Sequence, residues 1–230
     1  MEYYIPALKQ AEKMDDKFAI NLANRKIGII YHFKGDYDKA LDYTIRSSRV
    51  CKEIGDKIGM VPCLHNIGTD FLTLGNNKKA EGYYAQSLNM AEQIDDKHGI
   101  ALNYNSIGML NYIKGLYKDA EECLKKSLIM QMQDSFGGFL WTTTFLFLTY
   151  KKLGKEFDVG KINSLINTAE KIVFHLNYYL YQLLEDNSYL ETAYNQVQET
   201  ADNLEPDVAA KFLSYPSPKA IVEEWEKVNK

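Results

Sequence analysis

The sequence predicts an all-α fold, a right-handed solenoid of stacked helical hairpins, and two features of the chain carry this prediction. One is a repeat with a period of 40 residues, and the other is hydrophobic spacing of three and four residues within each repeat. The repeated positions are Ile27-Gly28, Ile67-Gly68 and Ile107-Gly108; Gly35, Gly75 and Gly115; Ala40, Ala80 and Ala120; and Asp16-Lys17, Asp56-Lys57 and Asp96-Lys97. Equal steps at four places indicate units that stack on one another, so we expect an extended surface rather than a single core.

Each unit is predicted to be a helix, a tight turn and a second helix. In the third copy, Ile100, Tyr104 and Ile107 recur at helical spacing and share one face. Asp96 can cap the start of this helix, and Gly115 ends it because glycine tolerates the left-handed backbone needed there. The second helix is outlined by Tyr117, Ala120, Leu124, Ser127, Leu128 and Met130.

Glycine in the middle of a helix costs about 1 kcal/mol relative to alanine. Gly28, Gly68 and Gly108 all occupy such places, so we expect the partner helix to approach closely there, with the repeated alanines opposite. Pro62 takes a place that leucine holds in the neighbouring repeats. Because proline lacks a backbone donor, we expect this helix to start late, near Val61, or to bend.

These residues resemble the tetratricopeptide repeat over roughly residues 1 to 133. The matching positions are Ile27-Gly28 with Tyr31, Ile67-Gly68 with Phe71, Ala80 with Tyr84, and Ala120 with Leu124. The period is longer than the usual one of about 34 residues, the closing proline is missing, and Asn111 stands where an aromatic residue is expected. The longer unit resembles the subtype in kinesin light chains and bacterial signalling proteins.

The repeat pattern predicts four segments. They are a half repeat holding only a second helix in residues 1–16, three repeats of 40 residues in 17–136, two degenerate hairpins in 137–204, and capping helices in 205–230. In the last two segments we expect helices over 138–153, 158–172, 174–185, 188–204 and 206–213, and a final helix from Ser217-Pro218 to Val228. The tail, with Ala193-Tyr194, Ala201, Pro206-Asp207, Phe212-Leu213 and Ala220-Ile221, weakly resembles the ends of such regions in multidomain ATPases and nucleotide cyclases.

The N-terminal half repeat places Tyr3 to Met14 where a second helix belongs. Ile5, Leu8 and Met14 are expected to rest on the next helix, while Tyr4 faces the place of an absent upstream helix. We expect this end to contact either more of a longer native chain or a second copy; the alternative is a true N-terminal cap.

Composition excludes several classes of function. The net charge of −4 argues against nucleic-acid binding. No signal peptide is recognisable, and the most apolar stretch, Phe139 to Tyr150, is too short to span a membrane. Three cysteines without CxxC spacing indicate reduced thiols, and hence a cytoplasmic protein.

Motifs for catalysis or cofactors are absent from the sequence. It has no phosphate-binding glycine loop, no dinucleotide fingerprint and no HExxH. The four histidines are scattered, and the repeat position of Asp15-Asp16 and Asp95-Asp96 favours helix capping over metal binding. We therefore expect no enzymatic activity, no metal and no cofactor.

The resemblance implies that the first helix of each hairpin lines a concave binding surface. Carried over residue by residue, the first tier is Arg25, Ile29 and His32, the second is His65, Asn66 and Thr69, and the third is Asn105, Met109 and Tyr112. Amides and imidazoles can bond a peptide backbone, and the larger apolar side chains offer contact area. The alternative is that these are ordinary solvated positions.

The expected function is therefore a non-catalytic interaction scaffold that holds a peptide or a partner helix of another protein in its concave groove. A basic clamp for C-terminal carboxylates is disfavoured, because only Arg25 and Lys26 provide cations on this face. The alternative function is a regulatory segment of a larger signalling enzyme, such as a cyclase, kinase or ATPase, whose catalytic domain lies outside this chain.

Overall fold

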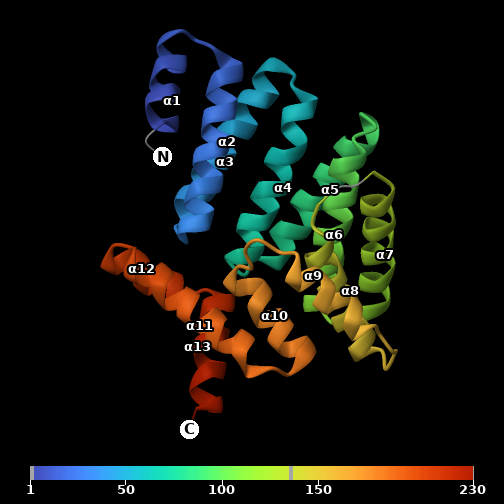
Figure 1. Ribbon diagram of the computed structural model, residues 1–230. Helices are drawn as coiled ribbons and strands as arrows, with labels where there is room; N and C mark the ends of the chain where they lie inside the picture. The colour runs from blue at the N-terminus through green and yellow to red at the C-terminus, as the bar shows by residue number, and fades with distance from the viewer. Residues whose placement is uncertain (1–2, 135–136, 230) are drawn as a thin grey trace. The chain divides into compact units, whose positions relative to one another are not determined.

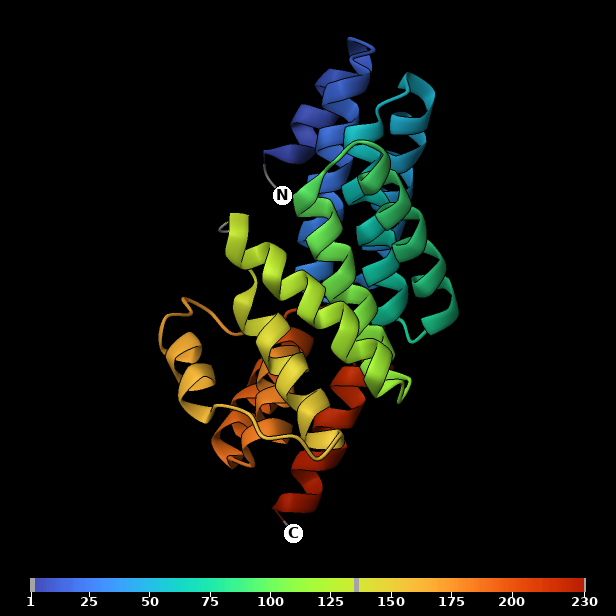
Figure 2. The same ribbon diagram turned by 90° about the vertical axis from the view of Figure 1, so that its right-hand side faces the viewer.

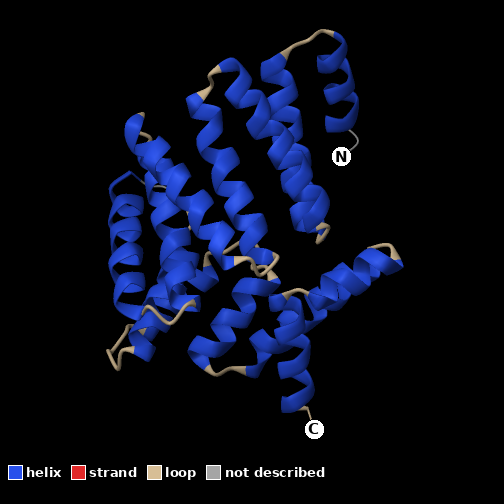
Figure 3. Cartoon of the chain, turned by 180° about the vertical axis from the view of Figure 1, so that it is seen from behind, coloured by secondary structure: helices blue, strands red, loops and turns tan. Residues whose placement is uncertain are grey.

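The computed structural model describes residues 3–134 and 137–229, and all the regular secondary structure within these ranges is α-helical (Figure 3). The helices are α1 Tyr4–Lys13, α2 Lys17–Lys34, α3 Tyr37–Ile54, α4 Lys57–Thr73, α5 Asn77–Gln93, α6 Lys97–Ile113, α7 Tyr117–Asp134, α8 Phe139–Lys152, α9 Val159–Asn167, α10 Phe174–Leu184, α11 Asn187–Asp202, α12 Pro206–Ser214 and α13 Pro216–Val228. They stack as antiparallel pairs, which confirms the predicted fold class of helical hairpins.

The helices fall into two compact units, and each is described by itself. Unit 1 comprises Met1–Gly99 and Thr200–Tyr215, and unit 2 comprises Ile100–Glu199 and Pro216–Lys230. In unit 1, α2 packs against α1, α3 and α4, and α4 packs against α5 (Figure 1). In unit 2, α8 packs against α7, α9 and α10 (Figure 2).

The turns between the repeat helices follow one rule with a step of 20 residues. A residue with positive φ stands at 15, 35, 55, 75, 95 and 115, as aspartate at 15 and 95 and as glycine elsewhere. At five of these six turns the next residue caps the following helix: Asp16, Asp36, Asp56, Asn76 and Asp96 each accept a hydrogen bond from the backbone N–H three residues on, at 2.8–3.2 Å. Side-chain caps of this kind satisfy donors that the first turn leaves free. The predicted roles of Asp96 and Gly115 are confirmed.

Close helix crossings occur at the repeated mid-helix glycines. A Cβ added to Gly68 would lie 2.8 Å from the Tyr84 ring, and one added to Gly28 would lie 2.7 Å from Thr44 Oγ1 and 3.1 Å from the Ala40 carbonyl oxygen. In unit 2, a Cβ on Gly108 would lie 2.6 Å from Leu124 Cγ. The predicted close approach is confirmed, and the residues at 44, 84 and 124 lie closest to it, four residues beyond the alanines.

Pro62 lies inside α4, which begins at Lys57, so the expectation of a late start near Val61 was wrong. The missing proline donor deprives the Ile58 carbonyl of its helical partner. Ile58 is 74% exposed, and water can therefore satisfy this carbonyl in the first turn.

The N-terminal helix packs differently from the expectation. Leu8 contacts a cluster with Ala23 and Ile27, and both Tyr4 and Ile5 lie against it. Met14 is exposed rather than packed, and it is the C-cap residue that follows the last turn of α1.

Two helix boundaries in unit 2 also differ from the prediction. Helix α9 ends at Asn167 instead of Ile172, and the Ile172 carbonyl accepts hydrogen bonds from the side chains of Asn177 and Gln196. Helix α13 begins at Pro216 rather than after Ser217. Proline is tolerated throughout the first turn, where its missing N–H would have no helical acceptor.

Residues from the C-terminal part complete unit 1 at the α2–α3 turn. Phe212 of α12 is fully buried, and its ring lies about 3 Å from where a Cβ on Gly35 would be. The ring of Tyr215 packs on Tyr37, and its hydroxyl donates to Asp38 at 3.2 Å, where Lys211 also binds. Gly35 is thus required by this contact as well as by its positive φ of 86°.

Candidate protein-binding surface

Helix α2 carries the first predicted tier. Ile27 and Gly28 are buried in the packing of this helix, while Arg25, Ile29 and His32 are partly exposed. The Arg25 Nε atom is buried and forms no hydrogen bond with a described residue. Arg25 and Ile29 are partly exposed, and no acidic side chain in the described ranges forms an ion pair with Arg25.

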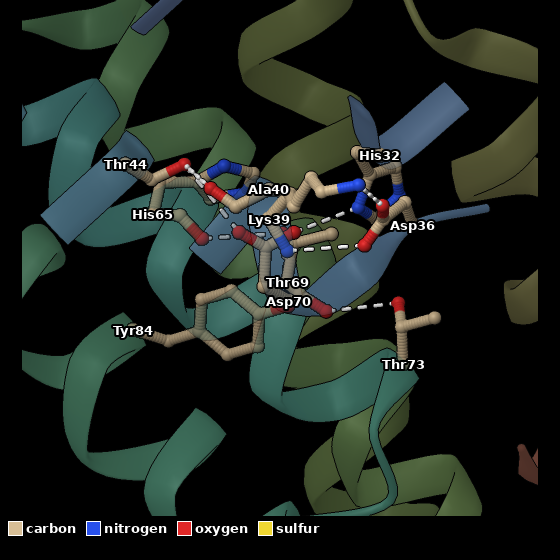
Figure 4. A network of polar contacts seen from close by, with 10 residues as sticks. All are labelled: His32, Asp36, Lys39, Ala40, Thr44, His65, Thr69, Asp70, Thr73 and Tyr84. Carbon is tan, nitrogen blue, oxygen red and sulfur yellow. Dashed lines mark hydrogen bonds and ion pairs between the residues drawn. The ribbon is translucent and has the colours of Figure 1, made fainter. Parts of the chain in front are cut away.

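His32 has a partner that the sequence did not suggest. Its Nδ1 lies 2.7 Å from Asp70 Oδ1, and Thr44 Oγ1 lies 3.4 Å from the other carboxylate oxygen, so α2, α3 and α4 meet in one polar network (Figure 4). Burial raises the pKa of Asp70 above its usual value, while the contact with His32 opposes this rise. The pair joins successive repeats, and it leaves His32 less available to a ligand than Arg25.

The second tier, on α4, is largely engaged in packing. His65 is 9% exposed, its ring lies 5.5 Å from the Tyr84 ring, and burial lowers its pKa to about 4. Thr69 donates to the His65 carbonyl and accepts from the Tyr84 hydroxyl (Figure 4). Asn66 is partly exposed and bonds His65 through its side chain. Within this tier, Asn66 is the side chain best placed to meet a partner.

The third tier, on α6, belongs to unit 2. Asn105 is buried and accepts a 3.0 Å hydrogen bond from the Thr142 hydroxyl of α8, and its amide nitrogen lies 3.6 Å from Met109 Sδ. Tyr112 packs edge-on against Phe145, and burial raises its pKa to about 12. Asn105 is thus held by the hairpin that follows, whereas Met109 and Tyr112 remain partly exposed.

An open cavity of about 740 Å³ in unit 2 begins beside Tyr112. It is lined by Tyr112, Leu148, Lys151, Lys152, Tyr181, Gln182, Glu185, Asn187 and Glu224. Lys151 is committed within the fold, since its ammonium donates to the carbonyls of Gln182 and Leu183 and to Glu185. Glu224 accepts from the Tyr181 hydroxyl. The wall is mixed in charge, with no dominant sign that would select one ligand.

The histidine, cysteine and acidic side chains of the described ranges do not gather into a metal site. No cluster of three or more histidine, cysteine, aspartate or glutamate side chains there could hold a metal ion. Cys51 and Cys63 are buried with their sulfurs 4.0 Å apart, and Ser47 lies beside Cys63. None of the helices in those ranges is both long and apolar enough to cross a membrane.

Several exposed residues of α2 were missed as candidates. Phe18, Leu22 and Phe33 are large, apolar and exposed, and Lys26 lies beside Arg25. Their signal in the sequence was helical spacing with Ile29, together with the absence of any acidic residue between Lys17 and Lys34.

The geometry of stacked hairpins with a 40-residue period agrees with comparison to known families. The family model described as tetratricopeptide repeat matches residues 19–93 and again residues 64–133, which together span half of the chain. The chain belongs to the tetratricopeptide repeat family. No curated protein matches this tetratricopeptide repeat chain significantly in sequence.

Solved structures share the fold at low sequence identity. BtubC (BKLC) from P. vanneervenii is 21% identical with a TM-score of 0.62, and the match covers 74% of each chain. A Rap protein complexed with Competence and Sporulation Factor is 18% identical with a TM-score of 0.66, covering 98% of this chain and 70% of that one. A putative kinesin light chain from Podospora anserina is 14% identical with a TM-score of 0.50, covering 88% and 94%. These likenesses confirm the tetratricopeptide fold and the resemblance to kinesin light chains.

Proposed function

We propose that this chain is a non-catalytic interaction module that binds a peptide or a helix of a partner protein along the exposed faces of its first-in-hairpin helices. The observation that carries the proposal is the division of α2 into two sides. Ile27 and Gly28 are fully engaged in packing, while Arg25 and Ile29 at the predicted positions are partly exposed. A helix face that the core does not use is free to bind.

Two further observations support this proposal. Tetratricopeptide repeats generally serve protein–protein interaction, and a Rap protein of similar fold is complexed with Competence and Sporulation Factor. Extended arrays also offer contact along several helices at once, which suits a segment rather than a small substrate.

Selection from a random heptapeptide phage library tests the proposal. We expect enriched peptides, and we expect Ile29→Ser and Asn66→Ala to weaken their binding at least about tenfold, since contacts near the centre of an interface dominate its affinity. The control is Lys52→Ala, which changes an exposed residue of α3. Melting temperatures of all variants should stay close to that of the parent. The proposal fails if no peptide is enriched, or if the control weakens binding as much as the α2 and α4 variants.

A further inference from the structure

One face of α2 carries an uncovered row of apolar side chains. Phe18 is 67% exposed, Leu22 47% and Phe33 71%, and Ile29 lies partly exposed between them. Steps of four and seven residues place the four on one side of the helix. Exposed apolar groups gathered in this way mark interaction surfaces, in contrast to single ones scattered over a protein.

The length of this row limits what can bind it. Phe18 and Phe33 are 15 residues apart, which corresponds to about 22 Å along a helix. An extended chain advances about 3.3 Å per residue, so about seven residues of a partner segment would cover the row.

Positive charge lies in the middle of the row. Helix α2 has Lys17, Arg25, Lys26 and Lys34 and no aspartate or glutamate, in a protein whose net charge is −4. Lys17 is paired with Asp15 and Glu53. By contrast, no acidic side chain in the described ranges forms an ion pair with Arg25 or Lys26.

Two other cations of unit 1 are paired with aspartates. Lys39 binds Asp36, and Arg46 binds Asp42, both within their own helix or its cap. The one carboxylate on α4, that of Asp70, is buried and bonded to His32. Asp70 is therefore engaged by His32 and forms no ion pair with Arg25 or Lys26.

We infer that the α2 face selects an acidic, apolar segment of a partner protein, about seven residues long, whose central carboxylates meet Arg25 and Lys26 and whose flanking apolar side chains cover Phe18, Leu22 and Phe33. The inference rests on the proposed function and adds the chemistry of the partner. Complementary charge sets orientation and association rate, while the apolar contacts supply most of the affinity.

A cationic helix with exposed phenylalanines could also lie on an anionic membrane. The structure favours a peptide, because α2 is flanked by α1, α3 and α4 and presents one narrow row in place of a broad apolar face. Vesicles of phosphatidylserine and phosphatidylcholine provide the comparison. Sedimentation of the chain with them, abolished by Lys26→Glu, would overturn the inference, as would self-association lost in the same variant.

The decisive readout is the composition of peptides selected from the random heptapeptide library. On the parent chain we expect aspartate or glutamate at central positions between apolar residues, and on Lys26→Glu we expect that preference to disappear. A selected peptide, made with glutamine or asparagine in place of its acids, should bind at least about tenfold more weakly in fluorescence anisotropy. Raising the salt concentration should weaken the acidic peptide and leave the amide peptide nearly unchanged.

The matched control variant is Lys52→Glu, a charge reversal on exposed α3, which should leave both affinities within about twofold. Phe33→Ser should weaken both peptides, because it removes apolar contact only. Binders without acidic preference would overturn this inference and leave the proposed function standing. Failure to select any binder would overturn both.

Discussion

The Ser127 hydroxyl donates a 2.7 Å hydrogen bond to the backbone carbonyl oxygen of Ala101, joining the two helices of the α6–α7 hairpin. The same bond occurs 40 and 80 residues earlier, from Ser87 to Val61 at 2.9 Å and from Ser47 to Asn21 at 3.1 Å. All three serines are fully buried. A small residue with a hydroxyl thus fixes the approach of the helices in every full repeat.

Replacing Ser127 with alanine should lower the free energy of unfolding by about 1 kcal/mol, because one buried hydrogen bond is lost and Gln131 loses an acceptor. Urea unfolding followed by circular dichroism measures this change. Ser164→Ala, at an exposed position of α9, is the control and should stay within about 0.5 kcal/mol of the parent. Equal stability of the two variants would contradict the assignment.

Gly68→Ala and Gly82→Ala should change stability in opposite directions. At Gly68 the new Cβ meets the Tyr84 ring at 2.8 Å, so a loss of about 1–3 kcal/mol is expected. At Gly82, inside α5, nothing lies within 4 Å, and the higher helix propensity of alanine should add about 0.5–1 kcal/mol. Thermal unfolding of both variants checks the signs, and a gain at Gly68 would show that this crossing is not tightly packed.

The buried His65 should make the protein less stable in mild acid. Its folded-state pKa is about 4, below the ordinary value of 6.5, because burial disfavours the charged ring. The unfolded chain therefore binds more protons, so stability is full above pH 6.5 and falls as the pH drops from there toward 4. The total effect corresponds to about 3 kcal/mol. Unfolding curves of His65→Gln should lack this part of the pH dependence, while the exposed His98→Gln should retain it.

Asp70 should affect the pH dependence of stability in the direction opposite to His65. Burial raises its folded-state pKa, so this carboxyl adds stability at low pH and that contribution is lost as the pH rises through the raised value. Asp70→Asn keeps an oxygen for His32 Nδ1 but removes the buried negative charge. The stability of this variant relative to the parent should therefore be more favourable at pH 7 than at pH 4. Asp70→Ala leaves His32 without its acceptor and should cost about 1–3 kcal/mol at pH 7. A parallel pH dependence of the parent and Asp70→Asn would refute this account.

The repeated helices could be predicted because local signals agree with the packing. Glycine at 28, 68 and 108 requires a close neighbour wherever the chain folds into hairpins, and the caps at Asp16, Asp56 and Asp96 act within four residues. The end of α9 could not be predicted in this way. The Ile172 carbonyl leaves the helix to accept hydrogen bonds from Asn177 and from Gln196, a side chain 24 residues away.

The sequence predicts where the candidate residues lie on their helices, and it does not predict which of their side chains other helices engage. Spacing places Arg25, His65 and Asn105 at equivalent points of three helices. Whether each is free depends on residues from other helices: Tyr84 packs against His65, and Thr142 bonds Asn105. Such partners follow from the register between helices, which a single sequence does not reveal.

The 20-residue rhythm of left-handed residue and capping side chain has a consequence for how the array can change in length. Each boundary just before Asp16, Asp56 or Asp96 lies between a residue with positive φ and the residue that caps the next helix. A tandem copy of residues 56–95 would join Asp95 to Asp56, which are the same two residue types that meet at Asp95-Asp96. Both splice points of such a duplication reproduce a junction already present in the parent. The inserted hairpin would also bring its own glycine crossing and its own buried serine. The chain is therefore suited to lengthening by whole 40-residue repeats, without substitutions at the turns that join them.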